Sequence, residues 1–265
     1  MVYTDIADEI YGASKGSVPS GVHLSSARSG GIRLTRVHIT RPGLARPAGR
    51  YVTLEVPSMA ALDDKDQRYI EAIAAELRRL LPPAGLVLVV GVGNRRVTAD
   101  ALGPRTAAQV LVTRGLAPLP SGGLGLREVA SISPGVAGAT GIPLPQLLHS
   151  LVRSLKPAAV LCVDSLACSE PERLGRMVQL TDTGLCPASP GSARCVTRQQ
   201  LGVPVLAVGV PTMMDADEVC GQKGLVLAPR ELDAVVRRGS SLLALAINKA
   251  LQSQLSIAEL CYLAN

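Results

Sequence analysis

The sequence predicts an α/β fold, in which a mostly parallel sheet is flanked by helices on both faces and carries an appended N-terminal β-hairpin region. From residue 86 onward, short runs that are apolar throughout alternate with amphipathic segments; three of these runs are LVLVVG, AAVLCVD and VPVLAVGV. Strands that are apolar on both faces suit a parallel sheet covered on two sides, with the amphipathic segments as crossover helices. The chain has five Tyr but no Phe and no Trp, so Leu, Val, Ile and Ala must fill its core.

The first 85 residues differ from this α/β pattern. Residues 12–31 are rich in Gly and Ser and indicate a loosely ordered stretch. Two strand-like runs follow at 32–40 and 51–57, and the Pro- and Gly-rich RPGLARPAG between them predicts a β-hairpin. The segment LDDKDQRYIEAIAAELRRLL then has apolar residues at helical spacing. We therefore divide the chain into an N-terminal segment, 1–85, and an α/β core, 86–265, which forms one compact unit.

The core elements follow in order along the chain. The strand LVLVV precedes the helical segment GPRTAAQVLVTRGL, and LREVASI and LPQLLHSLVRSL come before the strand AAVLCVD. After the strand VPVLAVGV, the segment RELDAVVRRGSSLLALAINKALQSQL has its apolar residues on one helical face, which predicts a long helix packed on the sheet.

Composition narrows the classes of function. The net charge of +6 comes with arginines spread over the whole chain, and stacking aromatics are scarce, so we expect no direct nucleic-acid binding. The six cysteines contain no CxxC pair and are expected to be reduced, partly buried thiols. No apolar run reaches membrane-spanning length and no signal peptide opens the chain, which predicts a cytoplasmic protein without a membrane partner.

The loop GVGNRRVTADALGP, residues 91–104, follows the first core strand as a phosphate-binding loop would. A dinucleotide fingerprint would need a third glycine where Arg96 stands, and no Walker sequence occurs, so no nucleotide cofactor is expected. Gly91 and Gly93 instead let the backbone turn sharply off a buried strand, and with Asn94 they form a loop that presents Asp100.

Carboxylates stand at three predicted strand ends: Asp100, Asp164 and Asp215. Each alone could cap a helix or a turn, and for Asp215 we favour that role over an accessory one. Two carboxyls held close in a low-dielectric crevice share a proton; one then takes a proton from water while the other donates to the scissile carbonyl. A metal held by Asp100, Asp164 and a distant His is the alternative. Cys168 lacks a local base and is interpreted as structural.

Five ordered motifs carry a resemblance to a known family. They are LVVGVGNRRVTADALGP, PGVAGATGI, KPAAVLCVDSLACSEPERL, QLTDTGL and LGVPVLAVGVPTMMDA, and with YTDIADE and GRYVTLEVP they span nearly the whole chain. Together they closely resemble the germination protease of spore-forming bacteria. The loop also resembles that of hydrogenase maturation endopeptidases, which share a phosphorylase/hydrolase-like fold and grip a nickel site in their substrate.

The resemblance implies an unusual aspartic endopeptidase that cleaves small acid-soluble spore proteins during germination, without a cofactor, in the forespore and spore core. It implies Asp100 and Asp164 as the essential acids, a homotetramer, and a zymogen that removes a short N-terminal peptide. Substrates of this family are cut between an acidic residue and an apolar residue followed by Ala, which makes Asp5–Ile6 the expected processing bond. Two alternatives stay open: a metal-dependent maturation endopeptidase and a non-catalytic sporulation relative.

Overall fold

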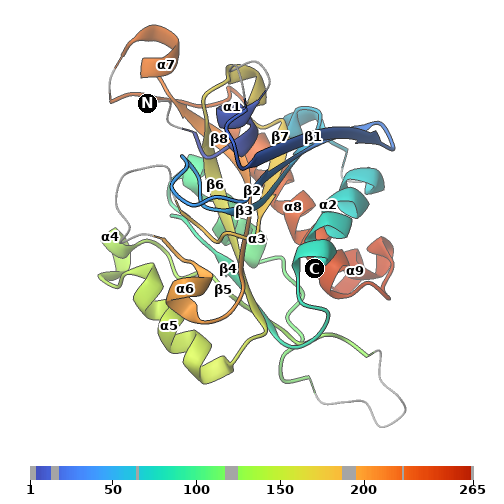
Figure 1. Ribbon diagram of the computed structural model, residues 1–265. Coiled ribbons are helices and arrows are strands. Elements are labelled where there is room, and N and C mark those ends of the chain that lie inside the picture. Colours follow the sequence, from blue (N-terminus) through green and yellow to red (C-terminus); the bar gives the residue numbers. More distant parts are fainter. Residues whose placement is uncertain are drawn as a thin grey trace.

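A computed structural model of the chain describes residues 4–12, 18–63, 66–116, 125–186, 195–222 and 224–263 (Figure 1). Nine strands of these residues form one sheet, in the order β1-β2-β3-β7-β8-β6-β4-β5, with β9 paired to β8. The strands are β1 (Val22–Ser29), β2 (Ile32–Ile39), β3 (Gly49–Glu55), β4 (Val87–Gly91), β5 (Val129–Ile132), β6 (Ala159–Cys168), β7 (Met177–Thr181), β8 (Val205–Asp215) and β9 (Val226–Leu227). The helices are α1 (Ala7–Tyr11), α2 (Gln67–Leu80), α3 (Leu102–Ala107), α4 (Ala137–Thr140), α5 (Leu144–Leu155), α6 (Arg198–Leu201), α7 (Asp217–Cys220), α8 (Leu232–Leu251) and α9 (Ile257–Leu263), with 3-10 turns at Met59–Ala61, Thr98–Asp100 and Pro171–Arg173.

The α/β class is confirmed, but the sheet is mixed rather than mostly parallel. Its parallel part is β5-β4-β6-β8, of which the apolar runs predicted β4, β6 and β8. On the other side of β8, the strands β7, β3, β2 and β1 pair antiparallel. The chain between β6 and β7 is too short for a crossover helix, so β7 runs back against β8. The sequence patterns gave no sign of β7.

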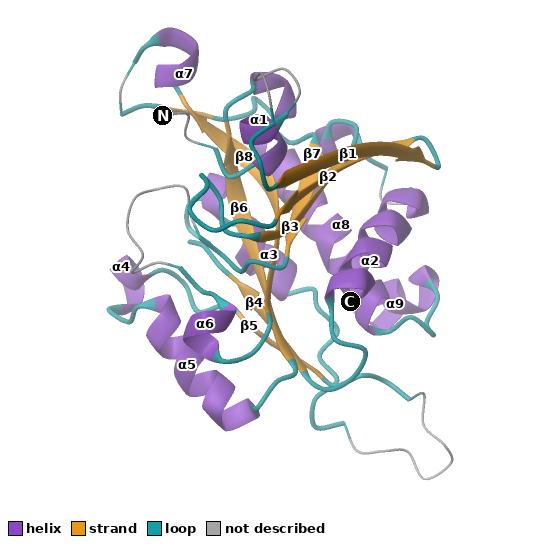
Figure 2. Cartoon of the chain, viewed as in Figure 1, coloured by secondary structure: helices purple, strands orange, loops and turns teal. Residues whose placement is uncertain are grey.

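Helices cover both faces of the sheet, as expected (Figure 2). Alternate residues of β4 and β6 point to opposite sides, because side chains alternate along a strand. Val87 and Val89 pack in the core formed with α2, α3, α8 and α9. Leu88 and Val90 pack in the core formed with α5 and α6. A strand that is apolar on both faces thus contributes side chains to two separate cores.

The first part of the chain joins this same sheet. The predicted hairpin is present as β2 and β3, and the predicted helix as α2. The expectation of a loosely ordered stretch at 12–31 is wrong for residues 22–29, which form β1 and pair along their whole length with β2. Residues 13–17 of that stretch lie outside the described residues. β3 pairs with β7, so the strands before residue 85 extend the sheet of the core; a division of the chain at that residue stays a prediction.

Two further differences concern α3 and the cysteines. The helix after the Asp100 loop ends at Ala107, because Asn248 of α8 binds the backbone beyond it, accepting from the Leu111 amide at 2.8 Å and donating to the Gln109 carbonyl at 3.1 Å. The expectation that all six thiols are reduced is wrong, since Cys186 and Cys195 form a disulfide.

None of the described helices is both long and apolar enough to span a membrane.

Candidate active site

The loop after β4 holds Asp100 in place through its glycines. Gly93 has a φ of 123°, and a Cβ there would lie 2.1 Å from the backbone oxygen of Asp100. The Asn94 amide donates a 2.7 Å hydrogen bond to Oδ2 of Asp100. The loop therefore wraps around the carboxylate and fixes its orientation, and a side chain at Gly93 would displace it.

Two further glycines, Gly91 and Gly103, let α3 pack directly against the strands. A Cβ at Gly91 would lie 2.2 Å from the Gly103 oxygen, and one at Gly103 would lie 2.2 Å from the Val92 oxygen and 2.3 Å from the Val163 oxygen. Backbone thus lies against backbone where β4, α3 and β6 meet. This close approach brings the loop with Asp100 to Val163, next to Asp164; both lie in the middle of β6 rather than at the strand end that the sequence predicted for Asp164.

Asp164 lies on β6 opposite Gly209 of β8. A Cβ at Gly209 would lie 2.4 Å from the Asp164 carbonyl oxygen, so this position also requires a glycine. The Asp164 Oδ1 accepts a 2.8 Å hydrogen bond from the amide of Ser165. Asp100 and Asp164 line two hollows, one of about 180 Å³ and one of about 370 Å³, so the two acids lie where these hollows meet.

The two carboxyl groups titrate unlike ordinary surface acids. Burial raises the pKa of Asp164 well above its usual value, and the negative charges of Asp100 and then Asp5 raise it further. Burial also raises the pKa of Asp100, while the hydrogen bond from the Asn94 amide lowers it. The protonated form is therefore favoured at Asp164 by burial and by two neighbouring negative charges, and at Asp100 by burial alone.

A residue from the chain's own N-terminal segment, Asp5, lies in the smaller hollow. Asp5 lines it together with both acids. The Asp5 amide donates to the Ala167 oxygen at 2.8 Å, and Asp5 Oδ2 accepts from the Ala167 amide at 2.9 Å. Ile6 is fully buried and packs against an apolar cluster of β6, β7 and β8, whose buried members are Leu166, Cys168, Met177 and Met214. Of the expected processing bond, the Asp5 side thus lines the hollow with the two carboxyls, and the Ile6 side packs in this apolar cluster.

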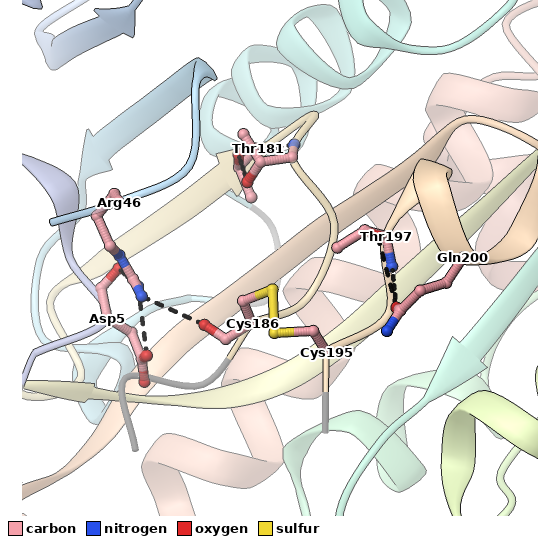
Figure 3. Close-up of a disulfide and its surroundings, with 8 residues drawn as sticks. Asp5, Arg46, Thr181, Cys186, Cys195, Thr197 and Gln200 are labelled. Atoms are coloured by element: carbon pink, nitrogen blue, oxygen red, sulfur yellow. Dashed lines mark hydrogen bonds and ion pairs between the residues drawn. A yellow bond between two sulfur atoms is a disulfide. The ribbon is translucent and has the colours of Figure 1, made fainter. Parts of the chain in front are cut away.

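Two residues of this hollow were not predicted from the sequence. Arg46, in the connection between β2 and β3, forms an ion pair with Asp5 at 3.3 Å and donates to the Cys186 carbonyl at 3.2 Å (Figure 3). Gln179, on β7, is only 5% exposed and donates to the Asp5 carbonyl at 2.8 Å. Both reach Asp5 only through the pairing of β3, β7 and β8, which leaves no local signal in the sequence.

The remaining candidates lie elsewhere or are inert. Asp215 accepts a 3.1 Å hydrogen bond from the Asp217 amide and does not line either hollow, which is the turn-capping role. Burial raises the pKa of the Cys168 thiol to about 12, as befits a structural cysteine. Within the described parts of the chain, no three His, Cys, Asp or Glu side chains are grouped so that they could hold a metal ion.

Comparison with known proteins gives the family. A family model described as germination protease matches residues 7–223. The germination protease of Caldanaerobacter subterraneus subsp. tengcongensis is 39% identical over 227 residues, covering 81% of this chain and 70% of the relative. That of Clostridium tetani is 36% identical over 82% of this chain and 72% of the relative. That of Clostridium acetobutylicum is 29% identical over 98% of both chains.

Among solved structures, the NiFe hydrogenase maturation protease HycI from Thermococcus kodakarensis aligns with a TM-score of 0.42 at 19% identity, over 66% of this chain and 98% of that one. The family model and the curated relatives agree over most of the sequence. The chain belongs to the germination protease family and is a peptidase.

Proposed function

We propose that this chain is the spore germination endopeptidase of its organism and that Asp100 and Asp164 activate the water that cleaves the peptide bond. The observation that carries the proposal is the shared setting of the two carboxyls: both line the same hollows, and burial raises the pKa of each. Perturbed acids that converge in a cavity are the usual mark of an acid–base site.

The two acids differ enough to take different roles. Asp100 is held by the Asn94 amide, a hydrogen bond that favours its ionised form, so it is the base that removes a proton from water. Asp164 is half-buried, and desolvation together with the negative charges of Asp100 and Asp5 raises its pKa, so we assign to it the proton that is later donated. No metal or other cofactor takes part in this scheme.

The substrates and setting follow from the family resemblance. We propose small acid-soluble spore proteins as substrates, a homotetramer as the assembled form, and the cytoplasm of the forespore and the spore core as the location. We also propose that the chain is made as a zymogen and processes itself at Asp5–Ile6; the support for this is that Asp5 lines the same hollow as both acids.

The test is cleavage of a small acid-soluble spore protein by the wild type, Asp100→Asn and Asp164→Asn. Loss of an acid or a base group lowers a rate by roughly 10²- to 10⁴-fold, so each variant should lose cleavage by that factor while remaining folded. Asp215→Asn is the matched control, since Asp215 only caps a turn, and it should cleave like the wild type. Full activity in both of the first two variants would overturn the assignment.

The same assay decides between this function and the two alternatives. Activity that is lost with a chelator and restored by added metal would favour a metal-dependent maturation endopeptidase. No cleavage of any spore protein by the folded wild type would favour a non-catalytic relative.

A further inference from the structure

The carbonyl oxygen of Asp5 is held by two side chains at once. Nη2 of Arg46 donates to it at 2.5 Å, and Nε2 of Gln179 donates to it at 2.8 Å. A carbonyl oxygen has two lone pairs, so these donors occupy both of its accepting positions. This is the carbonyl of the bond that is expected to be cut, between Asp5 and Ile6.

The orientation of the Gln179 amide follows from its second contact. Its Oε1 accepts a 2.8 Å hydrogen bond from the Ala7 amide, so its other end must be the NH₂ group that faces the Asp5 carbonyl. Gln179 therefore bridges the backbone on both sides of the Asp5–Ile6 bond. Because its side chain is buried, the amide depends on the peptide in the hollow to satisfy both of its ends.

Arg46 contacts both the backbone and the side chain of Asp5. Its Nη2 lies 3.3 Å from Asp5 Oδ1, while Nη1 is held by the Cys186 carbonyl (Figure 3). Its Nε is buried and has no hydrogen-bond partner among the described residues, and the same holds for Oγ of Ser165, which also lines the hollow. Unsatisfied polar atoms in a cavity next to a bound peptide indicate donors that still await a ligand.

We propose that Arg46 and Gln179 are catalytic residues that bind and polarise the carbonyl of the bond to be cut, and that Arg46 also selects an acidic residue before that bond. This inference rests on the proposed function, since it takes Asp100 and Asp164 as the acids and Asp5–Ile6 as a cleaved bond. To that function it adds two roles. Arg46 and Gln179 stabilise the negative charge on the carbonyl oxygen, and Arg46 also binds the carboxylate of the substrate.

With these two donors on the carbonyl oxygen, Asp164 gives its proton to the leaving nitrogen and not to that oxygen. Water, losing a proton to Asp100, forms a bond to the Asp5 carbonyl carbon, and the π electrons of the carbonyl move to its oxygen. Arg46 and Gln179 stabilise this oxyanion, so it needs no proton from Asp164. When the oxyanion collapses, the bond from carbon to the Ile6 nitrogen breaks and the nitrogen takes its proton from Asp164. The products are a carboxylic acid at residue 5 and an amine at residue 6, and exchange with solvent returns the acids to their starting state.

The first experiment compares variants in the cleavage of a small acid-soluble spore protein. Gln179→Met removes the amide, and Arg46→Lys keeps the charge but loses the planar fork that reaches two groups. Removing one donor to an oxyanion lowers kcat by roughly 100- to 1000-fold, and we expect this loss in both variants. Gln200→Met and Arg50→Lys are the matched controls, because neither residue lines the hollow, and they should keep wild-type kcat.

The outcomes separate this inference from the proposed function. If Asp100→Asn and Asp164→Asn are inactive while Arg46→Lys and Gln179→Met keep wild-type kcat, the role of Arg46 and Gln179 is wrong and the function stands. If the two Asn variants are fully active, the function fails and this inference fails with it. Lower kcat in Arg46→Lys and Gln179→Met, with melting temperatures unchanged, supports the inference.

The second experiment tests the selection of an acidic residue by a double-mutant cycle on self-processing. Wild type, Asp5→Asn, Arg46→Met and the double variant are made by cell-free synthesis, and the Asp5–Ile6 cut is followed by intact mass. Asp5→Asn should slow the cut at least about 10-fold in the wild type and have little further effect beside Arg46→Met, because the ion pair is already lost. Equal slowing in both backgrounds would show that Arg46 does not read the carboxylate.

Discussion

The single residue Asp164 combines burial with two neighbouring negative charges, and this has a consequence for stability. Its pKa is raised by burial, then by Asp100 and then by Asp5. Below the usual pKa of Asp, about 3.9, the group is protonated in both the folded and the unfolded chain and has no effect. As the pH rises, the unfolded chain ionises first, so the folded state loses stability until the raised pKa is reached.

We therefore predict that Asp164→Asn raises the free energy of unfolding at pH 7 and that the gain disappears near pH 4. The gain at pH 7 follows from the direction of the shift, because Asn carries no charge that folding would have to desolvate. The amide oxygen of Asn can still accept from the Ser165 amide. Urea unfolding at pH 7, 5.5 and 4 measures this, with Asp100→Asn expected to gain less. A gain that is the same at all three pH values would contradict the titration as its cause.

Residues of the site differ in how far the sequence could predict them. Asp100 and Asp164 could be found, because the carboxyl ends of parallel strands meet at one edge and each strand could be recognised from its own residues. Asp5 and Ile6 came from a family cleavage pattern. Arg46 and Gln179 could not be predicted. Arg46 lies in a Pro- and Gly-rich connection, and Gln179 lies on an antiparallel strand that no hydrophobic pattern in the sequence indicates. Only the sheet register brings them together.

At the level of elements, the position of α3 depends on Gly103. A Cβ there would meet two backbone oxygens at 2.2 and 2.3 Å, and backbone cannot move aside as a flexible side chain can. We predict that Gly103→Ala lowers the free energy of unfolding by about 3 kcal/mol, the upper range for overpacking, and lowers cleavage because α3 and the Asp100 loop shift. Urea unfolding and the spore-protein assay measure the two effects.

Gly138→Ala is the control for that variant. Gly138 lies in the helix α4, and nothing lies within 4 Å of a Cβ placed there. Alanine favours helix over glycine, so stability should stay the same or rise by up to about 1 kcal/mol. If both variants lose the same stability, close backbone packing at Gly103 is not the reason for its loss.

The disulfide is an element-scale link that the cysteine spacing did not reveal. Cys186 and Cys195 are nine residues apart, so their bond closes a short loop of the chain, and Cys186 itself lines the hollow. Restricting such a loop in the unfolded chain stabilises a protein by about 2 to 3 kcal/mol. We predict that Cys186→Ser with Cys195→Ser lowers the free energy of unfolding by this amount in urea.

Reduction provides the matched measurement for the disulfide. Dithiothreitol should destabilise the wild type to the level of the double variant and leave that variant unchanged. Cys220→Ser, at an exposed free cysteine, should have no effect. A wild type whose stability does not respond to dithiothreitol would show that the disulfide contributes nothing.

At the scale of the whole molecule, the sequence predicted the parallel strands and their helices but not the joining of the two regions. Parallel strands buried on both faces leave continuous apolar runs, whereas β1 is largely polar and β7, although buried throughout, carries Gln179 and Thr181 among its apolar residues. Their antiparallel pairing links the first three strands to the core through β3 and β7. This pairing depends on contacts between residues far apart in the chain, which local patterns do not record.

That joining also holds the N-terminal residues in the chain's own site. The Tyr11 hydroxyl oxygen accepts a 3.2 Å hydrogen bond from the amide of Arg46, in the connection between β2 and β3, and Asp8 accepts from Thr53 of β3 at 3.0 Å. On the other side, Asp8 pairs with Arg173 at 2.8 Å and Glu9 accepts from the Ser169 amide at 2.8 Å. The segment is thus held by elements from both regions of the same chain.

We predict from this that self-processing at Asp5–Ile6 is intramolecular. The segment is already bound at an effective concentration that no second chain can match, so the cut should be first order, with a rate constant unchanged over a 100-fold dilution. A ¹⁵N-labelled Asp164→Asn chain mixed with unlabelled wild type should stay uncut while the wild type processes itself, as read by intact mass. Cutting of the labelled chain in proportion to the wild-type concentration would show that the bond is reached from another molecule and that the buried segment must first leave its own site.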